Sequence, residues 1–316
     1  MREGARWSEM GVRIIGTGAF IPPKTVTNDD LAKTVDTSDE WISSRTGIHN
    51  RHIADNMTTS YMASKAGKMA VADCGIDVLD IDMIIVATSS PDYPFPSTAA
   101  LVQREIGALR AACFDISVAC TGFIYAYSIA DAYIRAGIYK NVLIIGAEVM
   151  SQHLDWSDRS VCVLFGDGAG AAVISGDKSD TVGTVTIHSD GSQADVLRCN
   201  KDNIVMDGRE VFTFAVRTVP QVIMEVLQNT GTDINDVTMF ILHQANRRII
   251  EAIAKKLKVD ITRFPMNLSE YGNTSAASIP ILLDELKKNG RIKAGDKTII
   301  SGFGAGLSWG AILVEW

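Results

Sequence analysis

Three polar residues lie where the local sequence gives no structural reason for them: Cys120, His243 and Asn273. Cys120 follows the apolar, β-branched segment FDISV, which predicts a buried strand. Apolar residues then recur at helical spacing from Phe123 to Ile134, which predicts a helix. Cys120 is therefore expected at the first turn of that helix, where unpaired N–H groups and the helix dipole favour the reactive thiolate. The alternative is a small buried side chain without chemistry, as most free cysteines are.

His243 and Asn273 extend this chemistry. His243 ends an apolar strand, and Asn273 lies in the loop YGNTSAAS. Either residue alone has an ordinary explanation, as a structural histidine or as a turn former. Together, a neutral imidazole Nε2–H and an amide N–H can donate to one developing oxyanion beside a thiolate nucleophile. The glycine turn from Gly302 to Gly306 can expose backbone N–H groups that form a second oxyanion hole with the N–H of Cys120.

The elements that must position these residues alternate between strands and helices. Apolar and β-branched runs predict strands over residues 12–22, 82–90, 114–118, 141–150, 181–191 and 237–243, and two further strands within 297–316. Helical periodicity predicts helices over 58–74, 97–107, 121–137, 210–230 with a kink at Pro220, and 247–259, and a last helix after the loop that begins at residue 264. This pattern indicates an α/β protein.

The two halves of the chain repeat one pattern. NVLIIGAE and GAGAAVIS in the first half match TIISGFG and LSWGAILVEW in the second, and DMIIVATSS matches VTMFILHQ. We therefore expect two related halves, over residues 12–175 and 176–316. Residues 1–11 precede the first predicted strand and are expected to form an extension with no assigned role. Each half places reactive candidates just beyond the C-terminal end of a strand, which is where open α/β sheets build their sites.

Composition narrows the class of protein. The 316 residues are 47% hydrophobic and 21% charged, as in soluble globular proteins, and no apolar run is long enough to span a membrane. No export signal pattern is present, so a cytoplasmic protein is expected. The five cysteines form no CxxC and no Cys/His cluster, which argues against disulfides and a metal site. The net charge of −7 argues against nucleic-acid binding.

The glycine-rich segment GDGAG, from Gly166 to Gly170, has two interpretations. It is loosely similar to a phosphate loop, but it has no GxGxxG pattern and no acidic residue at the ribose-binding distance. Close backbone approach in a strand pair explains these glycines more simply. The sequence thus predicts no dinucleotide cofactor.

Six motifs resemble one known family, the β-ketoacyl-acyl-carrier-protein synthases III, which initiate bacterial type II fatty-acid synthesis. They are DEWISSRTGI from Asp39, ACTGF around Cys120, FGDGAGAA from Phe165, HQANRRI from His243, YGNTSAAS around Asn273 and GFGAGLSWG from Gly302. The motifs run in family order, and the resemblance covers residues 12–316. It implies a thiolase fold of five αβαβα layers made of two pseudo-repeats, and a homodimer.

The resemblance also implies residue roles. Cys120 is similar to the acyl-accepting nucleophile, and His243 and Asn273 to the pair that drives decarboxylation. The backbone N–H groups of Cys120 and Ala305 would form the oxyanion hole, with Ala305 at a position where many relatives have glycine. Coenzyme A contacts would come from Trp41, Arg45, Arg159, Gly208, Phe212 and Asn246. Without the resemblance, we would interpret Trp41 as a residue buried beneath a surface helix.

Other implied roles concern the acyl chain and the partners. Phe95 matches a residue that reaches across the dimer into the partner's acyl pocket, and Met150 would form another wall. The implied docking stretch for an acyl carrier protein is Gln244, Ala245, Asn246, Arg247 and Arg248. The substrates would be an acyl-CoA, used as a substrate rather than as a cofactor, and malonyl-acyl carrier protein.

Four alternatives remain at this stage. Two are thiolase-fold enzymes, a starter synthase of secondary metabolism and a 3-hydroxy-3-methylglutaryl-CoA synthase. The third is a papain-like hydrolase, although the signature of that family around the cysteine is missing. The fourth is a scaffold protein in which Cys120 is only buried.

Overall fold

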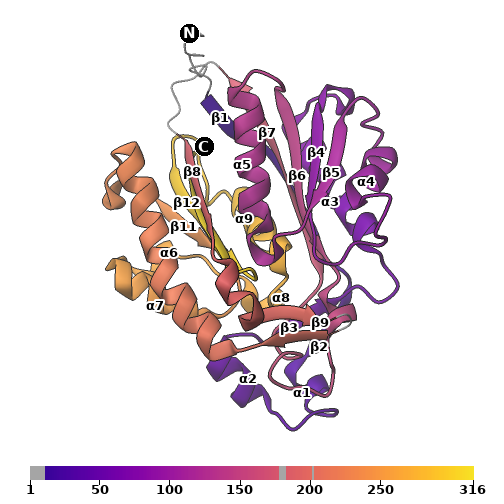
Figure 1. Ribbon diagram of the computed structural model, residues 1–316, viewed down its shortest axis with the longest axis vertical. Helices are drawn as coiled ribbons and strands as arrows, with labels where there is room; N and C mark the ends of the chain where they lie inside the picture. The colour runs from indigo at the N-terminus through magenta and orange to yellow at the C-terminus, as the bar shows by residue number, and fades with distance from the viewer. Residues whose placement is uncertain (1–10, 178–182, 201–202) are drawn as a thin grey trace.

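The computed structural model describes residues 11–177, 183–200 and 203–316, and within these ranges two mixed sheets alternate with three layers of helices (Figure 1). Residues 1–10 of the predicted extension, and residues 181–182 of a predicted strand, lie outside the described residues.

The first sheet is built from the N-terminal half. Its strands lie in the order β1 (Gly11–Phe20), β7 (Gly168–Asp177), β6 (Asn141–Glu148), β4 (Met83–Ala87) and β5 (Ala112–Ile116). β4 is parallel to β5 and β6, whereas β7 is antiparallel to β6 and β1. β6 and β4 are buried along their whole length, as their apolar runs predict. The prediction of a buried strand before Cys120 is wrong, because β5 lies at the edge of the sheet and is partly exposed.

The second sheet repeats this arrangement. Its order is β11 (Met239–Leu242), β12 (Lys297–Gly304), β13 (Ser308–Glu315) and β8 (Thr184–Ser189). β11 and β12 are parallel, and the other two pairs are antiparallel. The first sheet has the same order of pair directions, one parallel pair followed by two antiparallel pairs, along β4, β6, β7 and β1. The repeat inferred from the strand patterns is thus present in the pairing of the strands.

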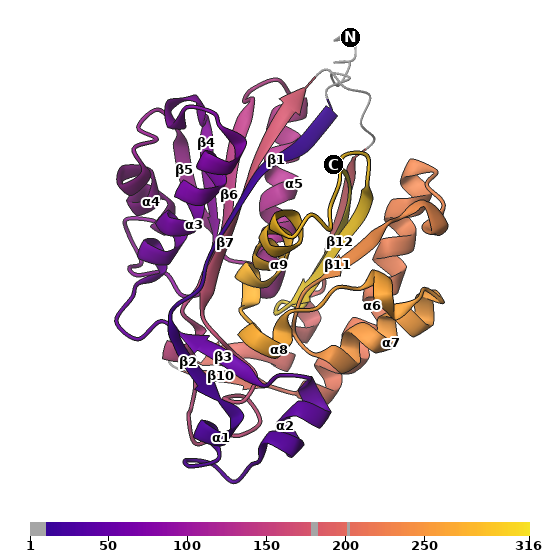
Figure 2. The same ribbon diagram turned by 180° about the vertical axis from the view of Figure 1, so that it is seen from behind.

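The helices form three layers around the sheets. α3 (Thr59–Cys74) and α4 (Thr98–Ile106) cover the outer face of the first sheet. α5 (Gly122–Arg135) and α9 (Ser278–Lys288) lie between the sheets, as both views show (Figures 1 and 2). α6 (Gly208–Thr230), which contains Pro220, covers the second sheet together with α7 (Arg247–Leu257). Three clusters of buried apolar side chains fill the four interfaces between these layers, and the central cluster covers both faces of the inner helices.

The shorter elements gather at one end of the molecule, toward which β6 and β12 run (Figure 1). They are β2 (Lys24–Thr27), α1 (Asn28–Leu31), α2 (Asp39–Thr46), β3 (Asn50–Ile53), β9 (Leu197–Asn200), β10 (Asn203–Met206) and α8 (Leu268–Tyr271). The loops after β6, β11 and β12 enter the same region, so it is the end where a site is expected.

Two glycines allow the inner layer to lie directly against the first sheet. A Cβ on Gly146 of β6 would lie 2.1 Å from the carbonyl oxygen of Ala276, and one on Gly170 of β7 would lie 2.6 Å from the backbone nitrogen of Ile281. This confirms close backbone approach as the reason for Gly170. It also means that the turn before α9 is in direct backbone contact with β6.

Two kinds of feature are missing from the described parts of the chain. No helix there is long and apolar enough to cross a bilayer. No group of three metal-binding side chains is found there either.

Candidate active site

Cys120 lies in a 3₁₀ turn, Ala119–Thr121, that leads directly into α5. Ala119 adopts the left-handed backbone conformation, with φ of 45°, a strained geometry that is common at functional sites. The side chain is buried, and its Sγ donates a hydrogen bond to Ser275 Oγ at 3.5 Å. Burial raises the pKa of Cys120 to about 12. The predicted position at a helix start is therefore correct, but the predicted resting thiolate is wrong, because desolvation favours the neutral thiol.

His243 follows the last residue of β11 and is buried. Its Nδ1 lies 2.7 Å from Ser278 Oγ, which also accepts a bond from the backbone N–H of Gln244 at 3.4 Å. The Ser278 hydroxyl can then donate to Nδ1, which places the ring proton on Nε2. Burial lowers the pKa of His243 to about 3, so the imidazole is neutral at physiological pH. The predicted neutral donor is thus consistent with the structure.

Asn273 is fixed by both its backbone and its side chain. Its N–H donates to the Leu164 carbonyl at 2.8 Å, and its carbonyl accepts from the N–H of Gly166 at 3.0 Å. The side-chain Oδ1 accepts from the N–H of Ser275 at 2.9 Å. Because the amide oxygen is engaged by the protein, the amide nitrogen is the side-chain atom left to serve as a donor.

These three residues line one cavity of about 430 Å³. Gly304, at the end of β12, lies on the same wall, and a Cβ placed on it would be 2.9 Å from the backbone nitrogen of Cys120. A second cavity of about 370 Å³ also reaches Cys120 and is lined by Met150 and Ala305, among others. The sulfur therefore lies where a deep chamber and a second pocket meet, and the predicted reactive residues are together.

Five of the six predicted coenzyme A residues line the first cavity, and the sixth, Arg159, packs on the ring of one of them. The five are Trp41, Arg45, Gly208, Phe212 and Asn246. The guanidinium carbons of Arg45 and Arg159 lie 4.7 and 5.3 Å from the centre of the Trp41 ring.

The contact between Arg159 and Trp41 leaves no room for a third group. Arg159 packs on the ring and is held by the backbone carbonyl and the carboxylate of Asp36. A planar heterocycle can enter between the two side chains only when Arg159 moves aside. The ion pair of Arg159 with Asp36 is exposed to solvent, which screens it, so it is easily broken.

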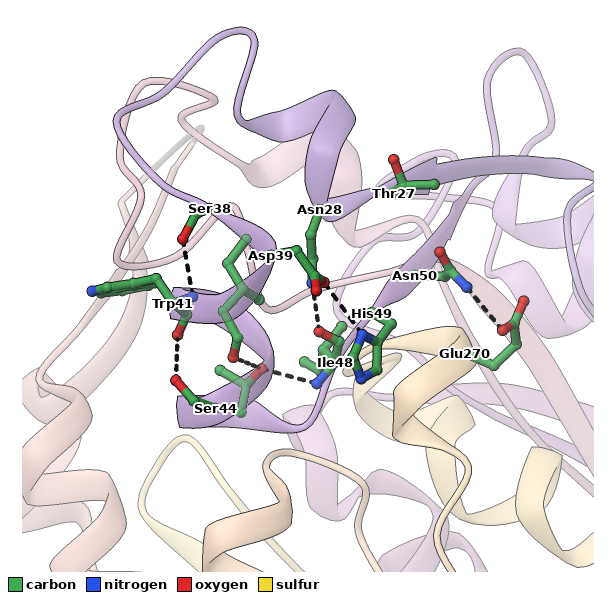
Figure 3. A network of polar contacts seen from close by, with 12 residues as sticks. Thr27, Asn28, Ser38, Asp39, Trp41, Ser44, Ile48, His49, Asn50 and Glu270 are labelled. Carbon is green, nitrogen blue, oxygen red and sulfur yellow. Dashed lines mark hydrogen bonds and ion pairs between the residues drawn. The ribbon is translucent and has the colours of Figure 1, made fainter.

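The segment that presents Trp41 is anchored on the side opposite the Trp41 ring (Figure 3). Ser38 caps α2 by accepting the N–H of Trp41, and the ring projects from the helix on the side away from Asn28 and Asp39. Asn28 donates to Asp39 at 2.8 Å and accepts from the fully buried Arg51 at 2.8 Å. Arg51 thus secures the segment from inside the protein, while Trp41, Arg45 and Thr46 of α2 line the cavity.

One residue of the predicted docking stretch is not at the surface. Gln244 is buried, where its amide donates to the Leu242 carbonyl and accepts from the N–H of Asn267. It therefore cannot contact a carrier protein and instead fixes the loop after β11. Ala245 and Asn246 line the cavity, whereas Arg247 and Arg248 are exposed on the first turn of α7.

Phe95 lines neither of the two cavities that reach Cys120. Its side chain lies in the proline-rich loop before α4 and is 85% exposed, the highest value among the large apolar residues described. Tyr93 in the same loop is exposed as well, and two exposed aromatic rings this close in the chain are typical of a contact surface.

Four residues of the site escaped the sequence interpretation: Glu148, Arg209, Ser275 and Ser278. The two serines lie in YGNTSAAS, where serine is expected as a turn former and carries no distinct signal. Arg209 lines the cavity beside Gly208. Glu148 did give a signal, since an acidic residue ends the otherwise apolar run NVLIIGAE.

Comparison with known proteins identifies the family of this arrangement. Residues 114–191 match the family model of 3-oxoacyl-[acyl-carrier-protein] synthase III, and residues 227–316 match the model of its C-terminal part. The β-ketoacyl-[acyl-carrier-protein] synthase III of Clostridium acetobutylicum is 48% identical, over 96% of this chain and 98% of that protein. The chain belongs to the synthase III family.

Solved structures agree with this assignment. The crystal structure of the synthase III of Aquifex aeolicus superimposes with a TM-score of 0.95, at 47% identity, over 97% of this chain and all of that chain. A priming β-ketosynthase of the R1128 polyketide pathway gives 0.91 at 34% identity, with 96% of each chain covered. The fold is therefore the five-layer thiolase fold of the condensing enzymes, and the papain-like hydrolase is excluded.

Proposed function

We propose that this synthase III family member catalyses the initiating condensation of type II fatty-acid synthesis. An acyl group from an acyl-CoA is transferred to Cys120, and it is then condensed with malonyl-acyl carrier protein to give a 3-oxoacyl-acyl carrier protein. The observation that carries this proposal is the meeting of Cys120, His243 and Asn273 in one chamber, with both donors neutral.

In the first stage, the Cys120 sulfur attacks the thioester carbonyl. The backbone N–H groups of Cys120 and Ala305 are proposed to stabilise the tetrahedral oxyanion, and both residues line the second cavity. Because the contact uses the backbone of Ala305, its methyl group is compatible with the role. Coenzyme A then leaves along the cavity between α2 and α6.

In the second stage, malonyl-acyl carrier protein loses CO₂ and leaves an enolate. His243 Nε2–H and the Asn273 amide N–H donate to the enolate oxygen, and the carbanion attacks the acyl-cysteine. A neutral imidazole suits this role, since it donates a hydrogen bond without giving up a full proton to the enolate. The pair is held for this task by Ser278 and by the N–H of Ser275.

The cavity mouth suits phosphate-bearing substrates. Exposed Arg45, Arg209 and Arg248 line it, in a chain whose net charge is −7. Guanidinium groups bind phosphates well, and both coenzyme A and the phosphopantetheine arm carry phosphates. Arg247 and Arg248 on α7 would also meet an acidic carrier protein, while Trp41 and Arg159 would hold the adenine.

A homodimer is the proposed assembly. β5 leaves an unpaired strand edge with partly buried Phe114 and Ile116, and the exposed Tyr93 and Phe95 lie on a nearby proline-rich loop. A second copy of the chain would cover these surfaces, and Phe95 would enter the acyl pocket of the partner. We propose a cytoplasmic location and no bound cofactor.

The test is a two-step assay with mass detection. Incubation with acetyl-CoA, isobutyryl-CoA and hexanoyl-CoA should add the acyl mass to the Cys120 peptide, and malonyl-acyl carrier protein should then release it as a 3-oxoacyl product. Condensation by Cys120→Ala at the wild-type rate, or no acyl adduct with any primer, would overturn the proposal. Condensation that requires the carrier protein of a polyketide pathway, and not that of fatty-acid synthesis, would instead favour a polyketide priming enzyme like the R1128 ketosynthase.

A further inference from the structure

Glu148 is a buried acid without a role so far. It is the last residue of β6 and is fully buried. Its Oε2 accepts hydrogen bonds from Ser90 Oγ at 2.7 Å, Ser89 N at 3.0 Å and Thr88 Oγ1 at 3.3 Å. A buried carboxyl held by several neutral donors is costly to maintain, and its presence at this position calls for an explanation.

The other carboxylate oxygen connects Glu148 to the nucleophile. Ser275 Oγ donates to Glu148 Oε1 at 3.0 Å. Since the hydroxyl has one proton, it must accept the bond from Cys120 Sγ at 3.5 Å. The three side chains therefore form one directed chain of hydrogen bonds, from the thiol through the hydroxyl to the carboxylate.

The backbone is built to place this chain. Gly146 and Glu148 lie two residues apart on the same face of β6, and the missing side chain of Gly146 admits the turn Ser275–Ala277. Ser275 itself has φ of 51°, a strained conformation that Asn273 Oδ1 holds by accepting its N–H. A serine that only filled space would not require this conformation.

The nucleophile needs a proton acceptor. As a buried thiol, Cys120 must lose its proton to attack a thioester. His243 is a poor acceptor, because burial lowers its pKa to about 3. Burial raises the pKa of Glu148, which strengthens its carboxylate as a base. The other titratable groups on the two cavities that meet at Cys120 are Cys199 and arginines 45, 198, 209 and 248.

We propose that Ser275 and Glu148 carry the proton of Cys120 away before acylation and return it after condensation. Ser275 touches the reacting sulfur and is a catalytic residue, while Glu148 acts through it as a positioning residue and proton store. This inference rests on the proposed function for its return step.

The proton balance closes over one cycle. In the first stage, the thiol proton passes to Ser275 Oγ while the Ser275 proton passes to Glu148, the sulfur forms its bond to the acyl carbon, and the departing CoA thiolate takes a proton from solvent. In the second stage, the carbon–sulfur bond of the acyl-cysteine breaks, and the Cys120 thiolate regains its proton from Glu148 through Ser275. The net reaction consumes one solvent proton and releases CO₂ and CoA thiol.

The test measures alkylation of Cys120 by iodoacetamide from pH 6 to pH 9, mapped by peptide mass because Cys199 is exposed. In the wild type the proton moves within the Cys120–Glu148 pair, so the rate should be nearly independent of pH. In Glu148→Gln it should be about tenfold lower at pH 7 and rise about tenfold per pH unit, following the thiolate fraction. Ser275→Ala breaks the same chain of hydrogen bonds without changing Glu148, and it should show the same pH dependence of alkylation as Glu148→Gln. If Glu148→Gln does not fold, Ser275→Ala tests the relay by itself.

Asp167→Asn is the matched control. Asp167 is also a fully buried carboxylate, held by the N–H of Ala54 and by Ser151, but it has no bond to the sulfur. It should keep the flat wild-type profile. Equal or faster alkylation in Glu148→Gln, or a flat profile in Ser275→Ala, would overturn the relay. The assay uses neither acyl-CoA nor carrier protein, so failure of the proposed function appears separately, as failure of acyl transfer.

Discussion

The two halves of the molecule share one strand arrangement but differ in what their strand ends carry. In the first half, Cys120 starts the inner helix and an acid, Glu148, ends β6. In the second half, the corresponding β12 ends in the glycine turn at Gly304, and the neutral donors His243 and Asn273 lie after β11 and before α9. Nucleophile and acid thus come from one half, and hydrogen-bond donors come from the other.

The strand arrangement that both halves share therefore determines where the side chains meet. The residues that differ between the halves determine the chemistry. Equivalent strand ends bring side chains to the same chamber from both halves. Changes to the two donors, His243 and Asn273, should therefore affect the decarboxylation stage and spare acyl transfer, while changes to Cys120, or to Glu148 and the Ser275 hydroxyl that links it to the sulfur, should affect acyl transfer itself.

The largest effects are expected at Asn273, and the first variant to test is Asn273→Ala. Removing one oxyanion donor typically costs about 3–4 kcal/mol, so malonyl decarboxylation should fall about 10²- to 10³-fold. Acylation of Cys120 by acyl-CoA should stay measurable. Release of CO₂ and the mass of the Cys120 peptide report the two stages separately.

Asn273→Asp sharpens the same comparison. The carboxylate keeps an acceptor for the N–H of Ser275 and loses the donor, so decarboxylation should fall at least as far as in Asn273→Ala. Decarboxylation at the wild-type rate in either variant would contradict the division between the halves.

Acid should destabilise the protein through His243. Its pKa is about 3 when folded and about 6.5 when unfolded, so the unfolded chain binds the extra proton between these values. Unfolding is therefore favoured as the pH falls, and this residue should contribute about 1.4 kcal/mol per pH unit between pH 6 and pH 4. Urea unfolding of the wild type and of His243→Asn measures the difference in slope, and equal slopes would show that His243 is not buried as a neutral ring.

A smaller effect is expected for Ser278→Ala. Loss of the hydroxyl releases Nδ1 of His243 and permits the wrong tautomer, at a cost of about 1 to 1.5 kcal/mol. Decarboxylation should slow about tenfold with acyl transfer unchanged. Ser278→Thr keeps the hydroxyl and should restore most of the rate, whereas no recovery would point to a packing defect instead.

The smallest effect is expected for a change of charge on the protein surface. Arg248→Glu should raise the KM for malonyl-acyl carrier protein several-fold at low salt, since surface pairs contribute about 1 kcal/mol and salt screens them. Arg291→Glu, an equal charge change at an exposed position on the loop before β12, is the control. An equal effect of both changes, or one that persists at high salt, would exclude docking at α7.

Much of the fold could be predicted from the residues themselves. Apolar periodicity predicts a helix over residues 58–74, and the structure has α3 at Thr59–Cys74 with Thr58 and Gly75 as its caps. The exposure of β5 could not be predicted, because the position of a strand in its sheet depends on which strands pair with it. An apolar run has the same sequence pattern in a central strand as in an edge strand. The family motifs located the chamber.

The sequence could not predict the protonation of Cys120 or the burial of Gln244. Helix position suggested a thiolate at Cys120, but the complete burial of the sulfur, which depends on contacts from distant segments, outweighs it. Gln244 adjoins exposed arginines in the sequence, yet its side chain points into the protein because Leu242 and Asn267 bind it. Both errors arise from tertiary contacts that local patterns do not encode.

The attachment of Asn273 has one more consequence. Although it belongs to the second half, its backbone is bonded on both sides to Leu164 and Gly166 of the first. When the halves shift against each other, Asn273 travels with the segment before β7, while His243 travels with β11. The distance between the side chains of His243 and Asn273 thus depends on how the two halves pack against each other. A substitution that loosens the packing between the halves would slow decarboxylation without changing either residue.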